Sequence, residues 1–260
     1  MEYVGKKYKV EIEQDDMADN PREAWDNAGT MICFHRGYTL GDKHRYDSPR
    51  DFLEDIAEKY VTPIEIIHYE VETYRSIEET LDEDRLNIEI VNFDDWTDEE
   101  LEEVIYNNVY MLNLYLYDHS GITMSTAPFS CRWDSGQVGV IYIEDKDAEK
   151  EFGKKPEETQ KEFDERVYKY LRGEVETYDQ YLTGEVYWFR VSKKQYFTER
   201  RVYKDAEGEL TGEVDERDGV NWVEIYSCGG FYGSDFKTNG VYDAIDDEVL
   251  KDVGLFKEGK

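Results

Sequence analysis

Alternating polar and apolar positions predict strands along much of the chain. Residues 8–13, Tyr-Lys-Val-Glu-Ile-Glu, show the period of two that a strand with one buried face requires. A short apolar segment at 29–34 is expected to pair with it. The other predicted strands cover residues 64–71, 86–91, 109–117, 136–143, 186–191, 195–203 and 222–226. Two polar segments, 118–134 and 205–218, are predicted to be loops that connect neighbouring strands.

Apolar residues at helical spacing, preceded by capping residues, predict four helices. Ser48 and Pro49 supply an N-cap and a proline at the first position of one helix. Thr97 caps another, whose first turn is acidic, as the helix dipole favours. A long helix is predicted near residues 157–183 and a short one over 246–253.

The order of these elements predicts an α+β fold. Strands and helices alternate too irregularly for a doubly wound parallel sheet, so we expect mostly antiparallel sheets with a few packed helices. A change of character near Gly153–Pro156 suggests two α+β domains, residues 1–153 and 154–260. A single domain is the alternative, because 260 residues suit either arrangement.

Composition adds a strong charge imbalance to this pattern. The chain holds 62 Asp and Glu against 31 Lys and Arg, which gives a formal charge of −31 at pH 7. Hydrophobic residues make up 39%, enough for a core, but the charge argues against direct binding to nucleic acid or to anionic membranes. No apolar run predicts a signal peptide or a membrane span, so we expect a cytoplasmic protein. Its partner is expected to be basic.

Few residues form a recognisable catalytic or metal-binding motif. The three cysteines lie far apart, and the four histidines fall on separate predicted elements, so we expect neither a metal site nor a cofactor. The glycine-rich Gly229–Gly233 segment is interpreted as a tight turn with aromatic packing, because no helix and no lysine follow it as a phosphate loop requires.

One polar segment, residues 118–134, supports an alternative hypothesis of an enzyme or a small-ligand protein. His119 and Cys131 both lie in it, and a base beside a thiol can generate a nucleophilic thiolate. Closeness in sequence does not establish that geometry. The simpler interpretation is that Asp118 and Ser120 shape a turn and that Cys131 packs inside. We therefore expect no enzymatic activity.

The placing of the acidic residues is the strongest anomaly in the sequence. Between Glu70 and Glu103 there are fifteen acids and only two bases, Arg75 and Arg85. A second acidic segment covers the predicted long helix. Such a surface can imitate the charge of a nucleic acid and bind in a basic groove, although a solvated face that maintains solubility is the ordinary explanation of a charge run. The expected contact residues are Asp82, Glu83, Asp84, Asp94, Asp95, Asp98, Glu99, Glu102, Glu158, Glu162 and Glu165.

Several segments resemble an acidic family of uncharacterised proteins from bacteriophages and mobile elements. They include Asn20-Pro21-Arg22-Glu23, Leu40-Gly41-Asp42-Lys43-His44 and residues 29–31, 33–36, 114–122, 129–137 and 177–184. The resemblance implies a phage-type origin and supplies no catalytic residue. In composition alone the chain is also similar to DNA-mimic anti-restriction and anti-CRISPR proteins. An inhibitor of a host nucleic-acid-binding defence protein is therefore the expected function.

Overall fold

The computed structural model describes residues 1–61, 93 and 96–255, and the chain forms two compact units. Unit 1 joins Met1–Pro21 to Gln180–Lys260, and unit 2 is Arg22–Asp179. This division differs from the predicted boundary at residue 153, because the first strands of the chain pair with strands near its end. The predicted strands at 64–71 and 86–91 lie outside the described residues.

The sheet of unit 2 is antiparallel and has the strand order β3-β6-β4-β5. Its strands are β3 (Thr30–Cys33), β4 (Val109–Asp118), β5 (Ile122–Ser125) and β6 (Ser135–Glu144). β3 pairs with β6, so the predicted pairing of residues 29–34 with the first strand is wrong. β5 lies inside the predicted 118–134 loop, where its four residues are too few to show a period in the sequence.

Five of the helices in the described residues belong wholly or mainly to unit 2. They are α1 (Pro21–Ala24), α2 (Pro49–Ala57), α4 (Asp98–Tyr106), α5 (Asp145–Phe152) and α6 (Gln160–Leu182). Ser48 and Thr97 form the predicted caps of α2 and α4, each within a reciprocal capping box. α6 runs unbroken through Gly173, so the predicted long helix is confirmed.

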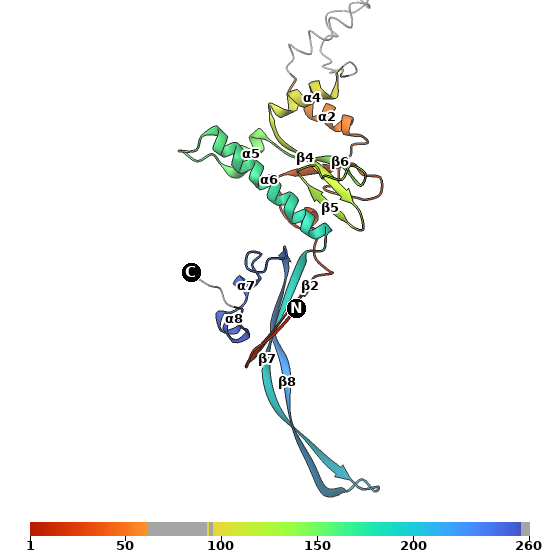
Figure 1. Ribbon diagram of the computed structural model, residues 1–260, viewed down its shortest axis with the longest axis vertical. Helices are drawn as coiled ribbons and strands as arrows, with labels where there is room; N and C mark the ends of the chain where they lie inside the picture. Colours follow the sequence, from red (N-terminus) through yellow and green to blue (C-terminus); the bar gives the residue numbers. More distant parts are fainter. Residues whose placement is uncertain (62–92, 94–95, 256–260) are drawn as a thin grey trace, which may run out of the picture. The chain divides into compact units, whose positions relative to one another are not determined.

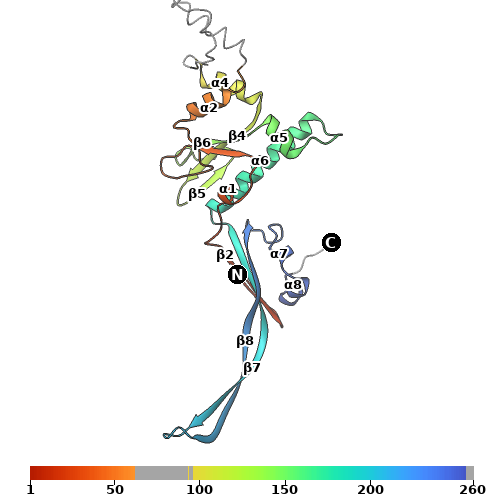
Figure 2. The ribbon, with the colours of Figure 1, turned by 180° about the vertical axis from the view of Figure 1, so that it is seen from behind.

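Helices cover both faces of the unit 2 sheet. α2 and α4 pack on one face, where Phe52, Ile56, Leu101 and Ile105 join side chains of β3, β4 and β6 in one buried cluster. α6 lies on the other face and buries Phe163, Val167, Leu171, Val175 and Tyr178. Gly29 permits this close approach, since an added Cβ there would lie 2.6 Å from Leu171 and 3.0 Å from Ile141. The result is a three-layer arrangement (Figures 1 and 2).

A buried arginine joins α6 to the loops at the start of unit 2. The Arg22 side chain is 1% exposed, and its Nε and Nη2 donate to the two oxygens of Asp42 at 2.9 and 2.6 Å. Its Nη1 donates to Glu174 on α6 at 2.7 Å, and Nη2 also donates to the Gly29 carbonyl. The second Glu174 oxygen accepts the amide of Ala28 at 2.8 Å. Because each carboxylate also accepts backbone donors, the buried charges are well satisfied.

Unit 1 is a second antiparallel sheet with two short helices on one face. Its strand order is β1-β2-β7-β8, with β1 (Glu2–Val4), β2 (Tyr8–Gln14), β7 (Val186–Lys204) and β8 (Leu210–Tyr232). α7 (Val241–Ala244) and α8 (Asp247–Val253) cover a core that includes Val10, Ile12, Phe189, Val191 and Leu250. The two antiparallel sheets and their packed helices confirm the predicted α+β fold.

β7 and β8 form a much longer hairpin than the sequence predicts. The register runs from Val186 opposite Tyr232 to Lys204 opposite Leu210, so most of the predicted loop 205–218 is strand. The residues Gly229–Tyr232 of the predicted tight turn are also part of β8. Beyond Lys193 the hairpin has no further strand beside it among the described residues, and it continues as two strands alone (Figure 1).

Replacing Arg22 by methionine should lower the stability of unit 2 strongly. The change Arg22→Met leaves the carboxylates of Asp42 and Glu174 without their buried cation, which costs about 3–5 kcal/mol. Urea unfolding followed by circular dichroism measures this loss. Arg45→Met is the matched control, because the Arg45 side chain is 78% exposed and its pair with Asp55 is worth about 0–1 kcal/mol. Equal effects of the two changes would contradict the structural role of Arg22.

Candidate functional site

The structure describes six of the eleven acidic residues that the sequence analysis expects to contact a partner. Asp82, Glu83, Asp84, Asp94 and Asp95 lie outside the described residues. α4 carries Asp98, Glu99 and Glu102, and α6 carries Glu162 and Glu165. Glu158 lies shortly before the start of α6. All six belong to unit 2.

Three of these six carboxylates serve the fold itself. Arg166 donates to both oxygens of Glu158 at 2.9 and 2.8 Å, and these hydrogen bonds lower the pKa of Glu158 to about 2. Glu162 accepts the amide and hydroxyl of Thr159, which together lower its pKa. Asp98 accepts a 2.7 Å hydrogen bond from Arg50. Glu158, Glu162 and Asp98 are therefore engaged within the fold, and their role as partner contacts stays a prediction.

The remaining carboxylates on α4 are held close to like charges. Partial burial and then the nearby charges of Glu99 and Asp98 raise the pKa of Glu102. Glu165, the last expected contact residue, is exposed and lies 3.9 Å from Lys161. A raised carboxyl pKa means that the fold disfavours the ionised form, so the charge on Glu102 is held at a cost in stability.

A second group of acids lies where α5 meets α6. Burial and then the charges of Asp164 and Glu149 raise the pKa of Asp145 at the start of α5. Asp164 on α6 accepts a 2.6 Å hydrogen bond from the hydroxyl of Tyr110. This group repeats the feature seen at Glu102, because carboxylates are held together without a cation between them.

Tyrosines connect the two acidic groups. The pKa of Tyr106 on α4 is raised by burial and then by Glu102 and Tyr168. The pKa of Tyr168 on α6 is raised by burial and then by Asp164 and Asp145. Tyr106 thus interacts with Glu102 and with Tyr168, and Tyr168 interacts with acids of α5 and α6. These interactions link a set of residues that we call the acidic surface: Glu99, Glu102, Tyr106, Asp145, Glu149, Asp164 and Tyr168.

The acidic surface carries little compensating positive charge. Among the described residues, no Lys or Arg lies within ion-pair distance of Glu99, Glu102, Asp145 or Glu149. The aromatic ring of Tyr168 does have a cation nearby, because the Arg172 guanidinium lies 6.0 Å from the ring centroid. Lys59 and Lys146 lie near its margin, but both pair with Glu144. The surface is therefore a strongly negative patch with exposed aromatic area.

An apolar pocket adjoins the acidic surface at Glu102. Its volume is about 280 Å³, and apolar side chains of α2, β4 and β6 make up most of its wall. Glu102 is the one charged residue among those that line it: Phe34, Pro49, Phe52, Leu53, Glu102, Met111, Gln137, Val138, Gly139 and Val140. Such a pocket suits an apolar group attached to a cation, because the carboxylate stands beside the apolar wall.

The 118–134 segment brings His119 and Cys131 to the same carboxylate. His119 Nδ1 and Cys131 Sγ both lie 3.5 Å from Asp134 Oδ2. The thiol and the imidazole thus share one carboxylate, and the described residues show no hydrogen bond between His119 and Cys131.

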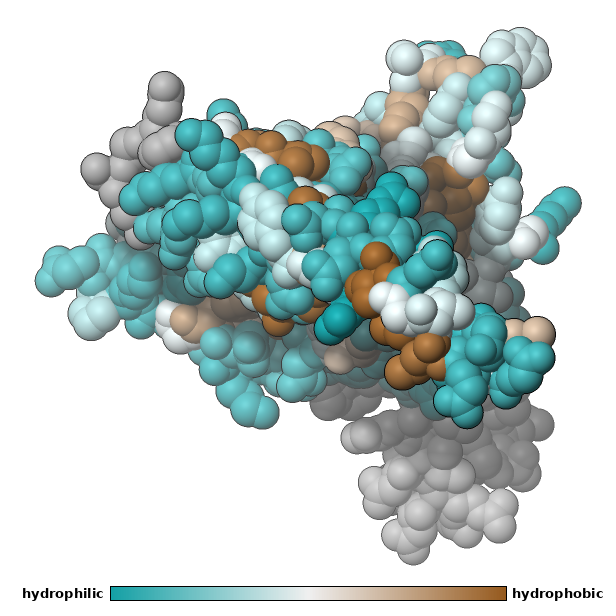
Figure 3. Space-filling model, turned by 90° about the horizontal axis from the view of Figure 1, so that it is seen from below, coloured by the Kyte–Doolittle hydropathy of each residue, from teal (hydrophilic) through white to brown (hydrophobic). Residues whose placement is uncertain are grey.

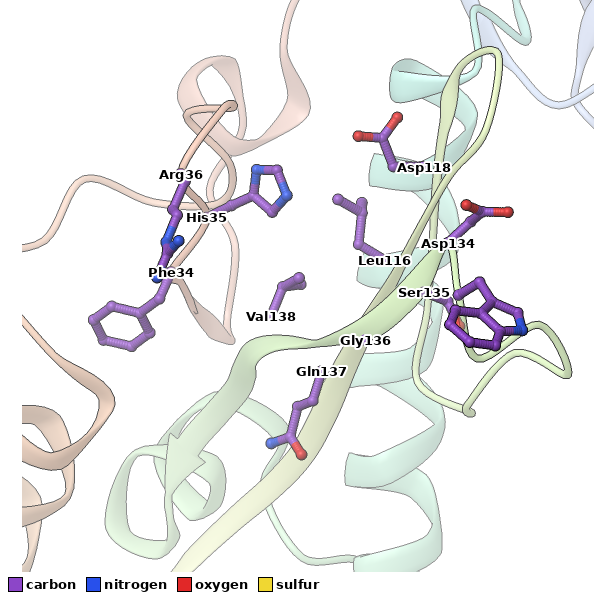
Figure 4. A pocket seen from close by; sticks show the side chains of 11 residues that line it. Phe34, His35, Arg36, Leu116, Asp118, Asp134, Ser135, Gly136, Gln137 and Val138 are labelled. Atoms are coloured by element: carbon purple, nitrogen blue, oxygen red, sulfur yellow. The ribbon is translucent and has the colours of Figure 1, made fainter.

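A separate open cavity of about 470 Å³ lies beside this segment. Figure 4 shows the side chains of His35 and Leu116 pointing into the space between the loop after β3 and the strands β4 and β6. Asp118, Trp133 and Asp134 contribute to its wall, but His119 and Cys131 are not among the lining residues. Tyr38 donates a hydrogen bond to Asp118 at 3.3 Å. A small ligand could occupy this cavity without contacting the two residues of the alternative hypothesis.

The chain matches no protein-family model, no curated protein and no solved structure. Within the described residues no three His, Cys, Asp or Glu side chains are grouped as metal ligands. None of the described helices is both long enough and apolar enough to cross a membrane. The candidate site consequently rests on the geometry of unit 2 itself.

Of the seven residues of the acidic surface, only Glu99 and Glu102 are among the contacts expected from the sequence. Asp145 and Glu149 were not expected as contacts, because α5 follows β6 with no N-capping side chain to mark its start. The run Asp145-Lys146-Asp147 directly after the predicted strand 136–143 is a signal that could have identified them. Tyr106 and Tyr168 join the site only through tertiary packing, which no local pattern reveals.

Neutralising Glu102 should stabilise the protein, whereas neutralising Glu158 should destabilise it. The pKa of Glu102 is raised above its usual 4.5, so its ionised form opposes folding, and Glu102→Gln raises the unfolding temperature at pH 7. The pKa of Glu158 is lowered to about 2, so its stabilising contribution is complete above pH 4.5 and disappears between there and pH 2. Glu158→Gln therefore lowers the unfolding temperature at pH 7.

Thermal unfolding between pH 2 and pH 7 measures both effects. The gain from Glu102→Gln should vanish below the usual pKa of a glutamate, where the wild-type carboxyl is also neutral. A loss of stability on Glu102→Gln at pH 7 would show that this carboxylate is compensated in solution, contrary to the structure.

Proposed function

We propose that this protein is a binding protein of phage or mobile-element origin that inhibits a host defence protein. It presents the acidic surface of unit 2 as a substitute for nucleic-acid charge and occupies the basic groove of a DNA- or RNA-binding target. It acts stoichiometrically, without cofactor or metal, in the cytoplasm of the host cell. The phage-type origin rests on the sequence resemblance.

The observation that carries this proposal is the raised pKa of Glu102 and Asp145. A surface that exists only for solubility can spread its charges, but these carboxylates are held against like charges and against tyrosines. Charge retained at a cost in stability favours a role in recognition. Duplex DNA carries one negative charge per roughly 1.7 Å of its axis, so a groove that accepts it favours a dense array of carboxylates.

The pocket beside Glu102 supplies a second element of recognition. Interface energy is concentrated where an apolar or aromatic anchor enters a pocket and excludes water. A basic groove whose cationic side chains alternate with apolar ones could place such an anchor between Phe52 and Met111 while a cation pairs with Glu102. Tyr106 and Tyr168 add rigid contact area around it.

Neutralising the acidic surface should weaken binding to the target. The combined change Glu99→Gln, Glu102→Gln, Asp145→Asn and Glu149→Gln removes four charges and should lower affinity at least about tenfold, or about 1.4 kcal/mol. Affinity capture from a host lysate, eluted in steps of salt and separately with duplex DNA, identifies the target. Titration of the purified target then measures the affinity of wild type and variant.

A matched control changes the same number of charges elsewhere. The control combines four changes at the exposed end of the β7–β8 hairpin in unit 1: Glu207→Gln, Glu209→Gln, Glu213→Gln and Asp215→Asn. It alters the net charge by the same amount. This control should bind as the wild type does. Equal weakening by both variants would mean that only net charge matters. Absence of any salt-sensitive, DNA-displaced partner from a host with active defences would refute the proposal.

A second candidate function is the binding of a small ligand in the cavity beside residues 118–134. The observation in its favour is the cavity itself, whose volume of about 470 Å³ lies in the range of ligand sites and whose wall combines His35, Asp118 and Trp133. Under this hypothesis the acidic surface is a solvated face, and the ligand binds against Asp118 and Asp134 at the two ends of the segment that also carries His119 and Cys131.

Replacing His119 and Cys131 separates the two functions. The double change His119→Ala and Cys131→Ser should leave capture of the basic target unchanged, because neither residue belongs to the acidic surface. His119 is 64% exposed, so little effect on folding is expected. The same capture and titration experiments measure the result. Loss of target binding in a folded double variant would transfer the function to the 118–134 segment.

A further inference from the structure

The exposed part of the β7–β8 hairpin, residues 193–223, is the second unusual surface of the molecule, and we call it the arm. All of its residues are exposed apart from Lys194, Gly219 and Trp222. Two strands alone are marginally stable in water, because a ribbon of this kind buries little apolar surface. The arm nevertheless keeps a continuous register from Lys193 opposite Val223 to Val202 opposite Val214.

The two faces of the arm differ in character. Alternation along the register places Tyr196, Val202, Val214 and Val220 on one face, which we call the apolar face. Tyr196 is 76% exposed there, and the three valines are between 43% and 49% exposed. Exposed apolar side chains are also visible among hydrophilic ones in Figure 3. Solvent thus reaches two apolar pairs, Tyr196 with Val220 and Val202 with Val214, and two polar levels of the ribbon lie between them.

The opposite face is polar and internally satisfied. Glu199 lies opposite Arg217 and accepts a 3.0 Å hydrogen bond from Arg201. Phe197 is the aromatic exception, and its ring covers Gly219, where an added Cβ would lie 2.4 Å from it. This face therefore uses its own side chains to stabilise the ribbon. The apolar face also has internal pairs, since Thr198 donates to Asp218 at 2.7 Å and Arg200 lies 3.5 Å from Glu216, but its large apolar side chains stay exposed.

Charge identifies what can cover the apolar face. The arm contains six Lys and Arg against eight Asp and Glu, whereas nearly all of the formal charge of −31 lies outside it. Repulsion between two copies of this chain is consequently weaker at the arm than at the acidic surface. On the apolar face the basic residues Lys194 and Arg200 belong to β7, and the acidic residues Glu216 and Asp218 belong to β8.

This segregation makes the apolar face complementary to itself. If two arms stack face to face about a two-fold axis that runs along the arm, each β7 residue lies over the β8 residue that is its own register partner. Arg200 then meets Glu216 of the second copy, Tyr196 meets Val220, and Val202 meets Val214. Symmetric pairing through the strand edges is disfavoured, because it brings the basic β7 strands or the acidic β8 strands together.

We infer that the arm is a self-association surface, and that two copies of the chain dimerise by stacking the apolar faces of their arms. The dimer forms through unit 1 and is independent of the acidic surface of unit 2. Salt screens the repulsion between two acidic chains, so the dimer should persist or strengthen as the salt concentration rises. Binding of a basic target should instead weaken as salt is added.

Sedimentation velocity over about 1–200 µM chain, with matched valine variants, tests the inference. Val220→Thr places a hydroxyl on the apolar face and, combined with Tyr196→Ser, should raise the dimer dissociation constant at least about tenfold. Val223→Thr makes the same exchange on the opposite face, next to Lys193, and should leave the constant unchanged. Circular dichroism verifies that all variants stay folded. A wild type that remains monomeric throughout overturns the inference.

A short bis-maleimide crosslinker tests the stacking. In a chain with Cys131→Ser and Cys228→Ser, Val202→Cys should crosslink two copies, because the two-fold axis places equal levels of the arms together. Arg201→Cys, at the same level but on the opposite face, should not. Crosslinking through residue 201 in preference to 202, or growth into open polymers instead of dimers, would overturn face-to-face stacking and favour pairing through the edges.

Discussion

The structure depends on how a small number of cations is distributed among twice as many acids. The 31 Lys and Arg of the chain cannot neutralise its 62 Asp and Glu. Each base that forms a close ion pair with one carboxylate is therefore not available to another. Within the described residues, the best-formed pairs hold the fold together. Arg22 joins the first loops of unit 2 to α6, and Arg166 ties the turn before α6 to that helix. Lys59 and Lys146 converge on Glu144, whose pKa falls to about 2 because their hydrogen bonds outweigh its burial.

The acidic surface is what this distribution leaves without cations. Part of its repulsion is relieved by the backbone, since Glu99 and Asp145 lie in the first turns of α4 and α5, near the positive ends of the helix dipoles. The relief is incomplete, because Glu102 and Asp145 still have raised pKa values. A sequence under selection for stability alone could replace either residue by its amide. Retention of both charges beside tyrosines and an apolar pocket is more consistent with recognition of a cationic partner than with solubility.

Local signals in the sequence predicted local structure well and long-range structure poorly. Ser48 and Thr97 marked helix starts correctly, because a capping box is completed within four residues. The same signal at Thr159 and Glu162 could have shown that Glu162 caps α6. The pair of Glu158 and Arg166 has no such marker. Residues 205–218 of the arm were predicted to be a loop because acids and glycines interrupt their alternation, and cross-strand pairs such as Arg200 and Glu216 replace burial in the arm.

The acidic surface and the arm differ in how their charges are arranged, and they lie in different units. On the acidic surface charge of one sign is concentrated, which repels a second copy and attracts a basic groove. On the arm, charges of both signs are present and segregated by strand, so a second copy meets its complement there. A chain with a formal charge of −31 can associate with itself only where its charge is locally balanced. The proposed target binding and the inferred self-association use different residues and therefore do not compete for them.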